Sequence, residues 1–341
     1  MLFKENFSLK NYNSFGIDAS ARYFATFDSV QQLELQLEAK WELAPVAQET
    51  MILGGGSNIL LTKNFDGLVL KNELGGIEVV KEDEDTVYLR SGAGVNWHQF
   101  VLYCIEKNYA GVENLSLVPG NVGASPMQNI GAYGVEIKDV FHSLEAFHVQ
   151  DKKRVHFSLA DCAFGYRESV FKGKYRNQFV ILNVTYRLNK KPQFNISYGA
   201  ISQELQNMGI KDLSIAAVSQ AVINIRRSKL PDPAVIGNAG SFFKNPEVDN
   251  NSFHTLKEKY PAIVGYDLHN GKTKLAAGWM IEQCGWKGYR KGDAGCHNLQ
   301  ALVLVNYGDA KGEEIYALSG EIISSVQEKF GITLEREVNI I

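Results

Sequence analysis

Residues Asn114–Val135, which read NLSLVPGNVGASPMQNIGAYGV, contain no charged side chain, although charged residues make up 21% of the chain. Prolines, glycines and amides interrupt the run of about 20 apolar residues that a membrane span requires. We therefore expect this segment, the uncharged loop, to be buried. A glycine-rich loop presents backbone N–H groups without Cβ atoms in the way, so it can hold phosphate oxygens or approach a flat ring closely. A tightly packed structural turn is the alternative interpretation, and the loop alone does not decide between them.

A second glycine-rich segment, the glycine loop Gly54–Asn58, lies between two short apolar runs in MILGGGSNILLT. It begins like a dinucleotide-binding fingerprint, but the final glycine is absent and the following residues indicate a strand rather than a helix. Gly265–Thr273 resembles a P-loop, yet its first glycine lies one residue too early and no apolar strand leads into it. The sequence has no GxSxG motif of a serine hydrolase. Two glycine-rich loops of this kind favour a large, buried, polyanionic cofactor.

Length and charge exclude other classes. A chain of 341 residues predicts two or three domains. Its formal net charge is −3, and Lys and Arg are dispersed, so no nucleic-acid partner is expected. The N-terminus lacks the apolar core of a signal peptide and no later segment is long enough to span a bilayer, so we expect a cytoplasmic protein without a membrane partner. Four cysteines and seven histidines show no metal-ligand spacing, and we predict buried thiols and no metal.

The first two thirds of the chain mix strands and helices. A turn is expected at Asn13–Gly16, followed by a helix from Val30 with apolar residues at Leu33, Leu37 and Trp41. Further helices are predicted at Asn96–Lys107, with Asn96 as the N-cap, and at Leu159–Phe164. Strands are predicted at Met51–Leu53, Ile59–Thr62, Gly67–Lys71, Ile77–Val80, Val87–Arg90, Ser143–Val149 and Phe179–Leu188. Because βα units do not alternate regularly, an α+β fold is favoured over a doubly wound sheet.

A helix at Ile215–Arg227, with Ser214 as a possible N-cap, precedes the segment KLPDP at Lys229–Pro233. Its two prolines stop the helix and suggest a domain boundary. Beyond it the pattern predicts a helical Leu275–Cys284, a strand at Ala301–Asn306, a helix near Glu313–Phe330 and a final strand from Ile332. These elements are sufficient for a separate small α+β domain.

Eight motifs follow one another along the chain: NSFG, LGGGSNIL, VPGNVGASPMQNIGAYG, FGYRES, LPDP, GNAGSFFKNP, KLAAGWMIEQCG and LEREV. Together they resemble the UDP-N-acetylenolpyruvoylglucosamine reductase (UDP-N-acetylmuramate dehydrogenase) family over nearly the whole chain. The segment Phe194–Gly199 is similar to the tyrosine-bearing loop of the longer, type I members. The resemblance implies a vanillyl-alcohol-oxidase/PCMH-type FAD-binding fold of two α+β subdomains, residues 1–72 and 73–228. A smaller α+β substrate-binding domain, residues 229–341, would follow.

The resemblance also implies a reaction. FAD is held noncovalently and NADPH is the co-substrate that reduces it and then leaves. UDP-N-acetylglucosamine enolpyruvate enters next and becomes UDP-N-acetylmuramate, a step of peptidoglycan precursor synthesis. Hydride passes from flavin N5 to the terminal carbon of the enolpyruvyl group, so the site must stabilise an enolate-like charge and supply one proton. The expected partner is this nucleotide sugar, and the chain is expected to be a monomer.

By resemblance, the two glycine-rich loops and the NSFG turn bind the FAD pyrophosphate and the groups around it. The expected cofactor-binding residues are Asn13, Gly16, Gly54, Gly55, Gly56, Ser57, Asn58, Pro119, Gly120, Gly123, Ala124, Ser125, Gln128, Gly131, Ala132, Tyr133 and Gly134. Many relatives have two glycines where this chain has Gly123 and Ala124. One backbone approach to FAD is therefore expected to differ here.

Three residues are assigned to catalysis by the resemblance. Arg167 can place a planar, charged fork against a carboxylate and stabilise the enolate; the alternative is an ion pair with Glu168. Ser241 is the proton donor, activated by low dielectric and nearby charge; the alternative is a hydroxyl that caps a turn. Glu337 assists Arg167 or relays a proton to Ser241. Strand alternation places Glu335 on the same face as Glu337, so the two acids must be distinguished.

Substrate contacts complete the expected site. Residues that contact the nucleotide or its phosphates in similar type I enzymes correspond to Tyr198, Lys229, Asn245 and Gln300, and Tyr166 is expected to line the nicotinamide and substrate channel. A solvated lysine and a surface amide are the alternatives for Lys229 and Gln300.

Two rival classes remain open. A flavin oxidase of the same fold usually attaches its flavin covalently, yet neither glycine-rich loop contains His or Cys. A nonenzymatic nucleotide-binding module would tolerate replacement of all three assigned catalytic residues.

Overall fold

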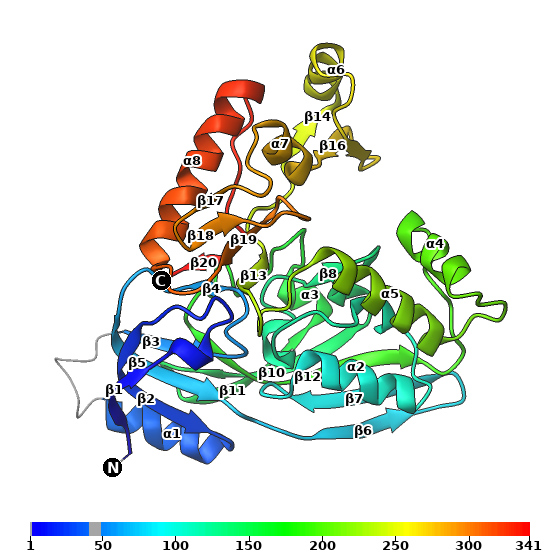
Figure 1. The fold of residues 1–341 in the computed structure, drawn as a ribbon. Helices are drawn as coiled ribbons and strands as arrows, with labels where there is room; N and C mark the ends of the chain where they lie inside the picture. Colours follow the sequence, from blue (N-terminus) through cyan, green and yellow to red (C-terminus); the bar gives the residue numbers. More distant parts are fainter. Residues whose placement is uncertain (1, 41–48) are drawn as a thin grey trace. The chain divides into compact units, whose positions relative to one another are not determined.

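The computed structural model describes residues 2–40 and 49–341 (Figure 1). The described residues form two compact units. Unit 1 comprises Met1–Phe7, Ala21–Gly55 and Asp66–Ser228, and unit 2 comprises Ser8–Ser20, Gly56–Phe65 and Lys229–Ile341. The last segment of unit 2 begins at Lys229, where the KLPDP segment predicted a boundary. The three-domain division at residues 72 and 228 stays a prediction.

The first sheet of unit 1 contains the glycine-loop strand. Its strand order is β1 (Lys4–Ser8), β2 (Ser20–Phe27), β5 (Phe65–Asn72), β3 (Thr50–Leu53). Helix α1 (Val30–Ala39) lies alongside this sheet and packs Leu33 and Leu37 against apolar strand residues (Figure 1). Trp41, the last residue of the predicted apolar stripe, lies outside the described residues. The parallel pairing of β3 with β5 fixes the point from which the glycine loop starts.

The second sheet of unit 1 is antiparallel and carries the main core. Its order is β11 (Lys153–Ser158), β10 (Phe141–His148), β12 (Phe179–Asn189), β7 (Thr86–Gly92), β6 (Ile77–Glu82). Helix α2 (Trp97–Glu106) is capped by Asn96 as predicted, because the Asn96 side chain accepts a hydrogen bond from Gln99 N. The rings of Trp97 and Phe100 lie 5.7 and 4.8 Å from that of Tyr186. This aromatic cluster joins the helix to β12.

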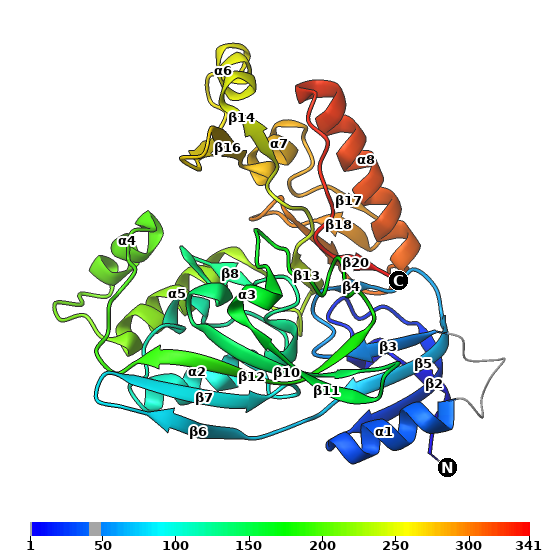
Figure 2. The same cartoon turned by 180° about the vertical axis from the view of Figure 1, so that it is seen from behind.

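Smaller elements complete unit 1 (Figure 2). Helices α4 and α5 pack together through a separate apolar cluster that includes Leu205 and Val218. The helices are α3 (Leu159–Cys162), α4 (Gly199–Asn207) and α5 (Ile215–Lys229). The uncharged loop and its neighbours form short turns of 3₁₀-helix at η3 (Glu113–Leu115), η4 (Val122–Ala124) and η5 (Ile137–Asp139), and a hairpin of β8 (Gly131–Ala132) and β9 (Val135–Glu136).

Unit 2 contains two further sheets and a parallel strand pair. The first sheet has the order β13 (Gly237–Ser241), β19 (Val303–Asn306), β18 (Ala294–Cys296), β17 (Arg290–Lys291), and the second β14 (Glu247–Asp249), β16 (Lys272–Leu275), β15 (Gly265–Asp267). Strand β20 (Asn339–Ile340) pairs with β4 (Ile59–Leu60). The helices are η1 (Lys10–Tyr12), α6 (Asn250–Lys259), α7 (Ala277–Gln283) and α8 (Gly312–Phe330).

The structure confirms the α+β class and most predicted elements. Strand β4 follows the glycine loop directly, and the P-loop-like Gly265–Thr273 forms parts of β15 and β16, so neither motif leads into a helix. Two predictions were wrong in detail. Leu275 ends β16 rather than starting α7, and the predicted strand from Ile332 is reduced to a bridge between Arg336 and Phe243 before β20. In residues 2–40 and 49–341, no helix is long and apolar enough to cross a membrane.

Two glycines of α8 predict opposite responses to alanine. A Cβ on Gly312 would overlap the Leu61 carbonyl oxygen, whereas a Cβ on Gly320 would meet only Arg336 Nη2, at 3.8 Å. We expect Gly320→Ala to stabilise the protein by about 1 kcal/mol through helix propensity. Gly312→Ala should destabilise it by about 1–3 kcal/mol through overpacking. Chemical denaturation of both variants measures the difference, and equal midpoints would contradict the packing described for the start of α8.

Candidate active site

The two glycine-rich loops meet inside unit 1. A Cβ atom on Gly55 would lie 2.8 Å from Gly120 Cα, which is closer than non-bonded carbons approach. Only backbone therefore fits where the glycine loop faces the uncharged loop. In residues 2–40 and 49–341, the N–H groups of Gly55, Gly56 and Ser57 donate none of the backbone hydrogen bonds that link loops and turns. The junction thus offers the backbone N–H groups that a backbone anion site requires.

The backbone before α2 holds the middle of the uncharged loop in place. Val122 N donates to Val95 O at 2.8 Å, and Gly123 N donates to Ala93 O at 2.9 Å. A Cβ on Gly123 would lie 2.6 Å from Ala93 Cβ, so this position requires glycine. Ala124, in contrast, is exposed, and its methyl group is accommodated. Of the two positions at which many relatives are expected to have glycine, this chain therefore replaces the one, Ala124, that has room for a side chain.

Buried polar side chains also fix the loop. The hydroxyl groups of Ser125 and Tyr186 lie 2.6 Å apart in the core. Asn129 Nδ2 donates to Glu136 Oε2 at 2.9 Å and to Gly165 O at 3.0 Å, and its Oδ1 accepts from Lys138 N. The buried polar side chains of the loop thus have hydrogen-bond partners, and their charged partner, Glu136, follows the loop rather than lying in it. Ser125, expected to bind FAD, has its hydroxyl directed to Tyr186.

The hairpin β8–β9 turns at Tyr133 and Gly134, whose φ angles are 50° and 81°. Positive φ at both central residues is the signature of a type I′ turn. The left-handed conformation is sterically costly for tyrosine, so its surroundings must hold it there. The Tyr133 ring packs edge-on against Tyr198, with centroids 5.3 Å apart.

Arg167 lies against the uncharged loop. It stands at the tip of a turn closed by the bridge between Gly165 and Glu168, and its φ of 56° is again left-handed. Arg167 Nη2 donates to Gly131 O at 2.8 Å, and Cζ lies 5.4 Å from the centre of the Tyr166 ring. The structure therefore brings together a predicted catalytic residue, a predicted substrate residue and a segment that is predicted to bind FAD.

Arg226 is a residue that the sequence reasoning missed. Burial lowers the pKa of its guanidinium, and the nearby Tyr133 hydroxyl offsets part of that effect. Within the described residues no carboxylate forms an ion pair with it. A buried cation without an acidic partner is costly, and a bound anion would offset that cost. The sequence did contain a sign that Arg226 faces inward, because it follows Val218 and Val222 at four-residue spacing on the buried face of α5.

His98 supports the start of the uncharged loop. Leu117 N donates to His98 Nδ1 at 3.0 Å, and Leu117 has a left-handed φ of 58°. Burial, followed by the positive charges of Arg227 and Arg226, lowers the pKa of His98 below 6.5. The neutral imidazole is therefore the form that holds Leu117.

In unit 2 the NSFG turn packs against the second half of the glycine loop. Ser14 N donates to Gly56 O at 3.0 Å, and a Cβ on Gly56 would overlap the Tyr12 carbonyl. Asn13 Nδ2 donates to Leu9 O and Ile17 O. The side chain of Asn13 thus shapes the turn that ends at Gly16.

Ser241 and Glu337 lie on neighbouring segments of unit 2. Ser241 ends β13 and is exposed, and the next residue, Phe242, accepts a hydrogen bond from Glu337 N at 2.8 Å. Asn58 Nδ2 donates to Glu337 O at 3.4 Å, which brings the glycine loop to the same place. Glu335 forms an ion pair with Lys244, at 2.5 Å. Glu335 is exposed and Glu337 is half-buried, and the choice between the two acids stays a prediction.

Asn245 and Gln300 meet at the start of α7. Asn245 Oδ1 accepts from Ala277 N at 3.0 Å, and a Cβ on Gly278 would lie 3.1 Å from Gln300 Oε1. Two predicted substrate residues from distant segments are thus neighbours. Lys229 is the exposed last residue of α5.

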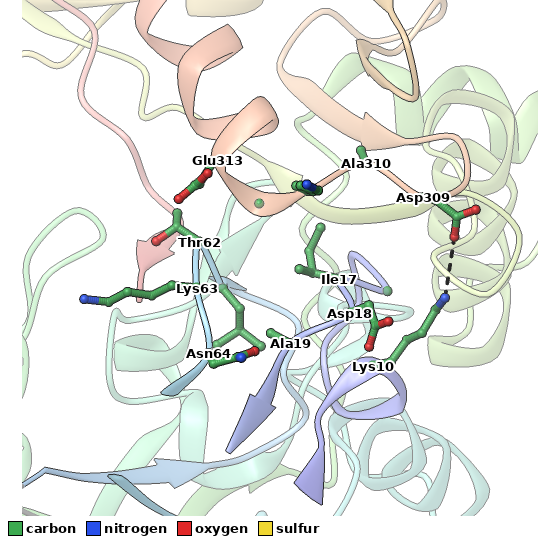
Figure 3. Close-up of a pocket in the computed structure, with 14 residues that line it drawn as sticks. Lys10, Ile17, Asp18, Ala19, Thr62, Lys63, Asn64, Asp309, Ala310 and Glu313 are labelled. Carbon is green, nitrogen blue, oxygen red and sulfur yellow. Dashed lines mark ion pairs between the residues drawn. The ribbon is translucent and has the colours of Figure 1, made fainter. Parts of the chain in front are cut away.

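A pocket of about 490 Å³ lies elsewhere in unit 2, beside the N-terminus of α8 (Figure 3). Of the expected site residues it includes Gly16 alone. Three lysines and three acids line it, and Lys10 pairs with Asp309 at 3.6 Å. These charges balance, so the pocket offers no field that selects an anion. Within the described residues no group of three or more His, Cys, Asp or Glu side chains could hold a metal ion.

Comparisons with known proteins agree on one family for both the N-terminal and the C-terminal parts of the chain. Residues 30–157 match a family described as "FAD binding domain", and residues 232–341 match "UDP-N-acetylenolpyruvoylglucosamine reductase, C-terminal domain". The UDP-N-acetylenolpyruvoylglucosamine reductase of Amoebophilus asiaticus is 52% identical over 338 residues, 99% of each chain. That of Flavobacterium johnsoniae is 49% identical over the full length of both chains.

A solved structure agrees in fold. UDP-N-acetylenolpyruvylglucosamine reductase from Thermus caldophilus aligns with a TM-score of 0.66 at 22% identity and covers 99% of each chain. The glycine-rich loops and the matched domain define an FAD-binding oxidoreductase. The chain belongs to the UDP-N-acetylenolpyruvoylglucosamine reductase family, which confirms the resemblance drawn from the eight motifs.

The contrast between Gly123 and Ala124 is testable. We expect Gly123→Ala to lower the affinity for FAD at least tenfold, because its Cβ would displace the uncharged loop from Ala93. Ala124→Gly is the matched control and should change the affinity less than threefold. Fluorescence titration of the deflavinated variants with FAD measures both. Equal affinities for the two variants would contradict the proposed position of the loop.

The depressed pKa of His98 predicts a pH dependence of stability. Between the folded-state pKa and 6.5 the unfolded chain binds more protons at this residue, so its contribution to stability falls as the pH falls through that window. Above 6.5 the contribution is complete. We expect the melting temperature of the native protein to fall more steeply from pH 7 to pH 5 than that of His98→Asn, which keeps an acceptor near Nδ1. If the melting temperatures of the two proteins fell equally with pH, the depressed pKa of His98 would be contradicted.

Proposed function

We propose that the chain catalyses the NADPH-dependent, FAD-mediated reduction of UDP-N-acetylglucosamine enolpyruvate to UDP-N-acetylmuramate, in peptidoglycan precursor synthesis. The observation that carries the proposal is the backbone junction of Gly55 with Gly120, in a chain whose relatives bear the name of this reductase. We further propose a cytoplasmic monomer with FAD-binding subdomains at residues 1–72 and 73–228 and a substrate domain at 229–341.

The residues present fit a flavin dinucleotide. The junction of the two loops presents peptide groups where a side chain would clash, as a pyrophosphate site requires. The buried guanidinium of Arg226 adds a positive charge close to Tyr133. Bound FAD would accept reducing equivalents from NADPH and supply hydride to the substrate. The proposed flavin contacts are the residues of the two loops, together with Asn13 and Gly16.

Arg167 stabilises the negative charge that develops on the substrate carboxylate. Its guanidinium is anchored through Gly131 O and lies over Tyr166, so its orientation is fixed before the substrate binds. Such preorganised charge is most effective in a site from which water is excluded. Tyr166 lines the same channel.

Ser241 donates the proton, and Glu337 assists it or Arg167. The hydrogen bond of Glu337 N with Phe242 O supports this pairing, because it fixes the register of the two segments. Glu335 is 70% exposed at its side chain, whereas Glu337 is half-buried, which makes Glu335 the weaker candidate. Tyr198, Lys229, Asn245 and Gln300 hold the uridine diphosphate.

Replacement of Ser241 separates the two half-reactions. We expect Ser241→Ala to retain flavin reduction by NADPH and to slow reduction of the enolpyruvyl substrate by about 10²–10⁴-fold, the usual contribution of a positioned proton donor. Stopped-flow absorbance of the flavin follows each half-reaction in turn. Equal loss in both half-reactions would remove Ser241 from this role.

The two acids provide a matched pair. Glu337→Gln should slow the second half-reaction by at least about 100-fold. Glu335→Gln should lose the ion pair with the buried Lys244, which costs stability, but it should change the rate less than threefold, since Glu335 takes no part in the proposed chemistry. Steady-state assays with both variants compare them directly. The reverse order of effects would transfer the assignment to Glu335.

A further inference from the structure

Two asparagine side chains join the Tyr133–Gly134 turn to the segment that carries Tyr198. Asn114 Nδ2 donates to Tyr133 O at 2.9 Å and to Asn195 O at 2.8 Å. Asn195 Nδ2 in turn donates to Gly134 O at 3.0 Å. Two of these hydrogen bonds link the uncharged loop to the 194–198 segment, about sixty residues away in sequence, and the third ties Asn114 to the Tyr133–Gly134 turn within the loop.

Both polar atoms of the Asn195 carboxamide form hydrogen bonds. While Nδ2 reaches Gly134, Oδ1 accepts from Ser197 Oγ at 2.7 Å and from Ser197 N at 3.3 Å. Aspartate would keep the acceptor and lose the donor, and alanine would lose both. The residue immediately after this turn is Tyr198. Asn195 therefore determines how the backbone leads into that tyrosine.

Tyr198 gains little orientation from burial. It is 47% exposed, and its side chain does not cap α4, although the residue is the N-cap. Its ring contacts Tyr133, which is held in a left-handed conformation on the other side of the link. Both ends of the ring contact thus depend on the turn that Asn195 binds.

We propose that Asn195 is a positioning residue that sets the orientation of Tyr198 from the Tyr133–Gly134 turn of the FAD-binding loop. The inference rests on the proposed function, because it takes Tyr198 as a contact of the substrate's nucleotide diphosphate. A side chain ordered before binding loses less entropy when the ligand arrives. Loss of the link therefore weakens substrate binding and leaves the chemical step largely intact.

A double-mutant cycle on the FAD-loaded full-length protein tests this proposal. Asn195→Ala should raise the KM for UDP-N-acetylglucosamine enolpyruvate about tenfold, with kcat and FAD content within twofold of the parent protein. Tyr198→Ala should raise the KM at least as much. The double variant should be no worse than Tyr198→Ala, because Asn195 acts through that ring. Asn195→Asp, which keeps the bond to Ser197, replaces the alanine variant if the latter does not fold.

Asn207→Ala is the matched control. Asn207 is an asparagine at the end of α4 whose Oδ1 accepts from Gln203 Nε2 at 3.1 Å, away from the link. Its KM should not change.

The outcomes distinguish failure of the positioning role of Asn195 from failure of the assignment of Tyr198 to substrate binding. An unchanged KM in Asn195→Ala, or multiplicative effects in the double variant, would overturn the positioning role. An unchanged KM in Tyr198→Ala would overturn instead the assignment of Tyr198 within the proposed function.

Discussion

The close approach of Gly55 to Gly120 is the constraint on which the first unit's part of the site depends. The loop after β3 and the loop after α2 can come so near only because neither residue carries a Cβ atom at the contact. The neighbouring backbone N–H groups are then available for a ligand rather than shielded by side chains. The same approach explains why the uncharged loop is both tightly packed and suited to an anion. The two interpretations that its sequence left open are thus compatible.

Absence of charge in this loop follows from its burial. Its backbone is held by Val95 and Ala93, and its polar side chains bond to Tyr186 and to the turn before Arg167. A charged side chain in such surroundings would need a partner that the loop does not offer. Positive charge reaches the loop instead from arginines of other segments, since Arg167 contacts Gly131 and Arg226 lies near Tyr133. In the proposed function, the backbone of the loop binds the cofactor and the arginines stabilise negative charge.

Local patterns predicted much of this arrangement. The Asn96 cap, the strand after the glycine loop and the end of the helix just before the prolines of KLPDP follow from residue type and spacing, and each is confirmed. Contacts between distant segments could not be predicted in the same way. The sequence placed Glu335 and Glu337 on one face, but only the fold shows that Lys244, ninety-one residues away, forms an ion pair with Glu335. Arg226 was missed because a basic residue at a helix end usually interacts with the helix dipole in solvent. Its position on the buried stripe of α5 indicated otherwise.

The most direct test of flavin binding by these loops is the absorbance spectrum of the purified protein, recorded before and after denaturation and during titration with FAD. A yellow protein whose flavin is released by denaturation and rebinds stoichiometrically is the expected result. Because neither glycine-rich loop contains His or Cys to which a flavin could be attached, the released flavin should be unmodified. A colourless protein that takes up no FAD, or one whose flavin stays attached to the denatured chain, would contradict noncovalent binding by the two loops.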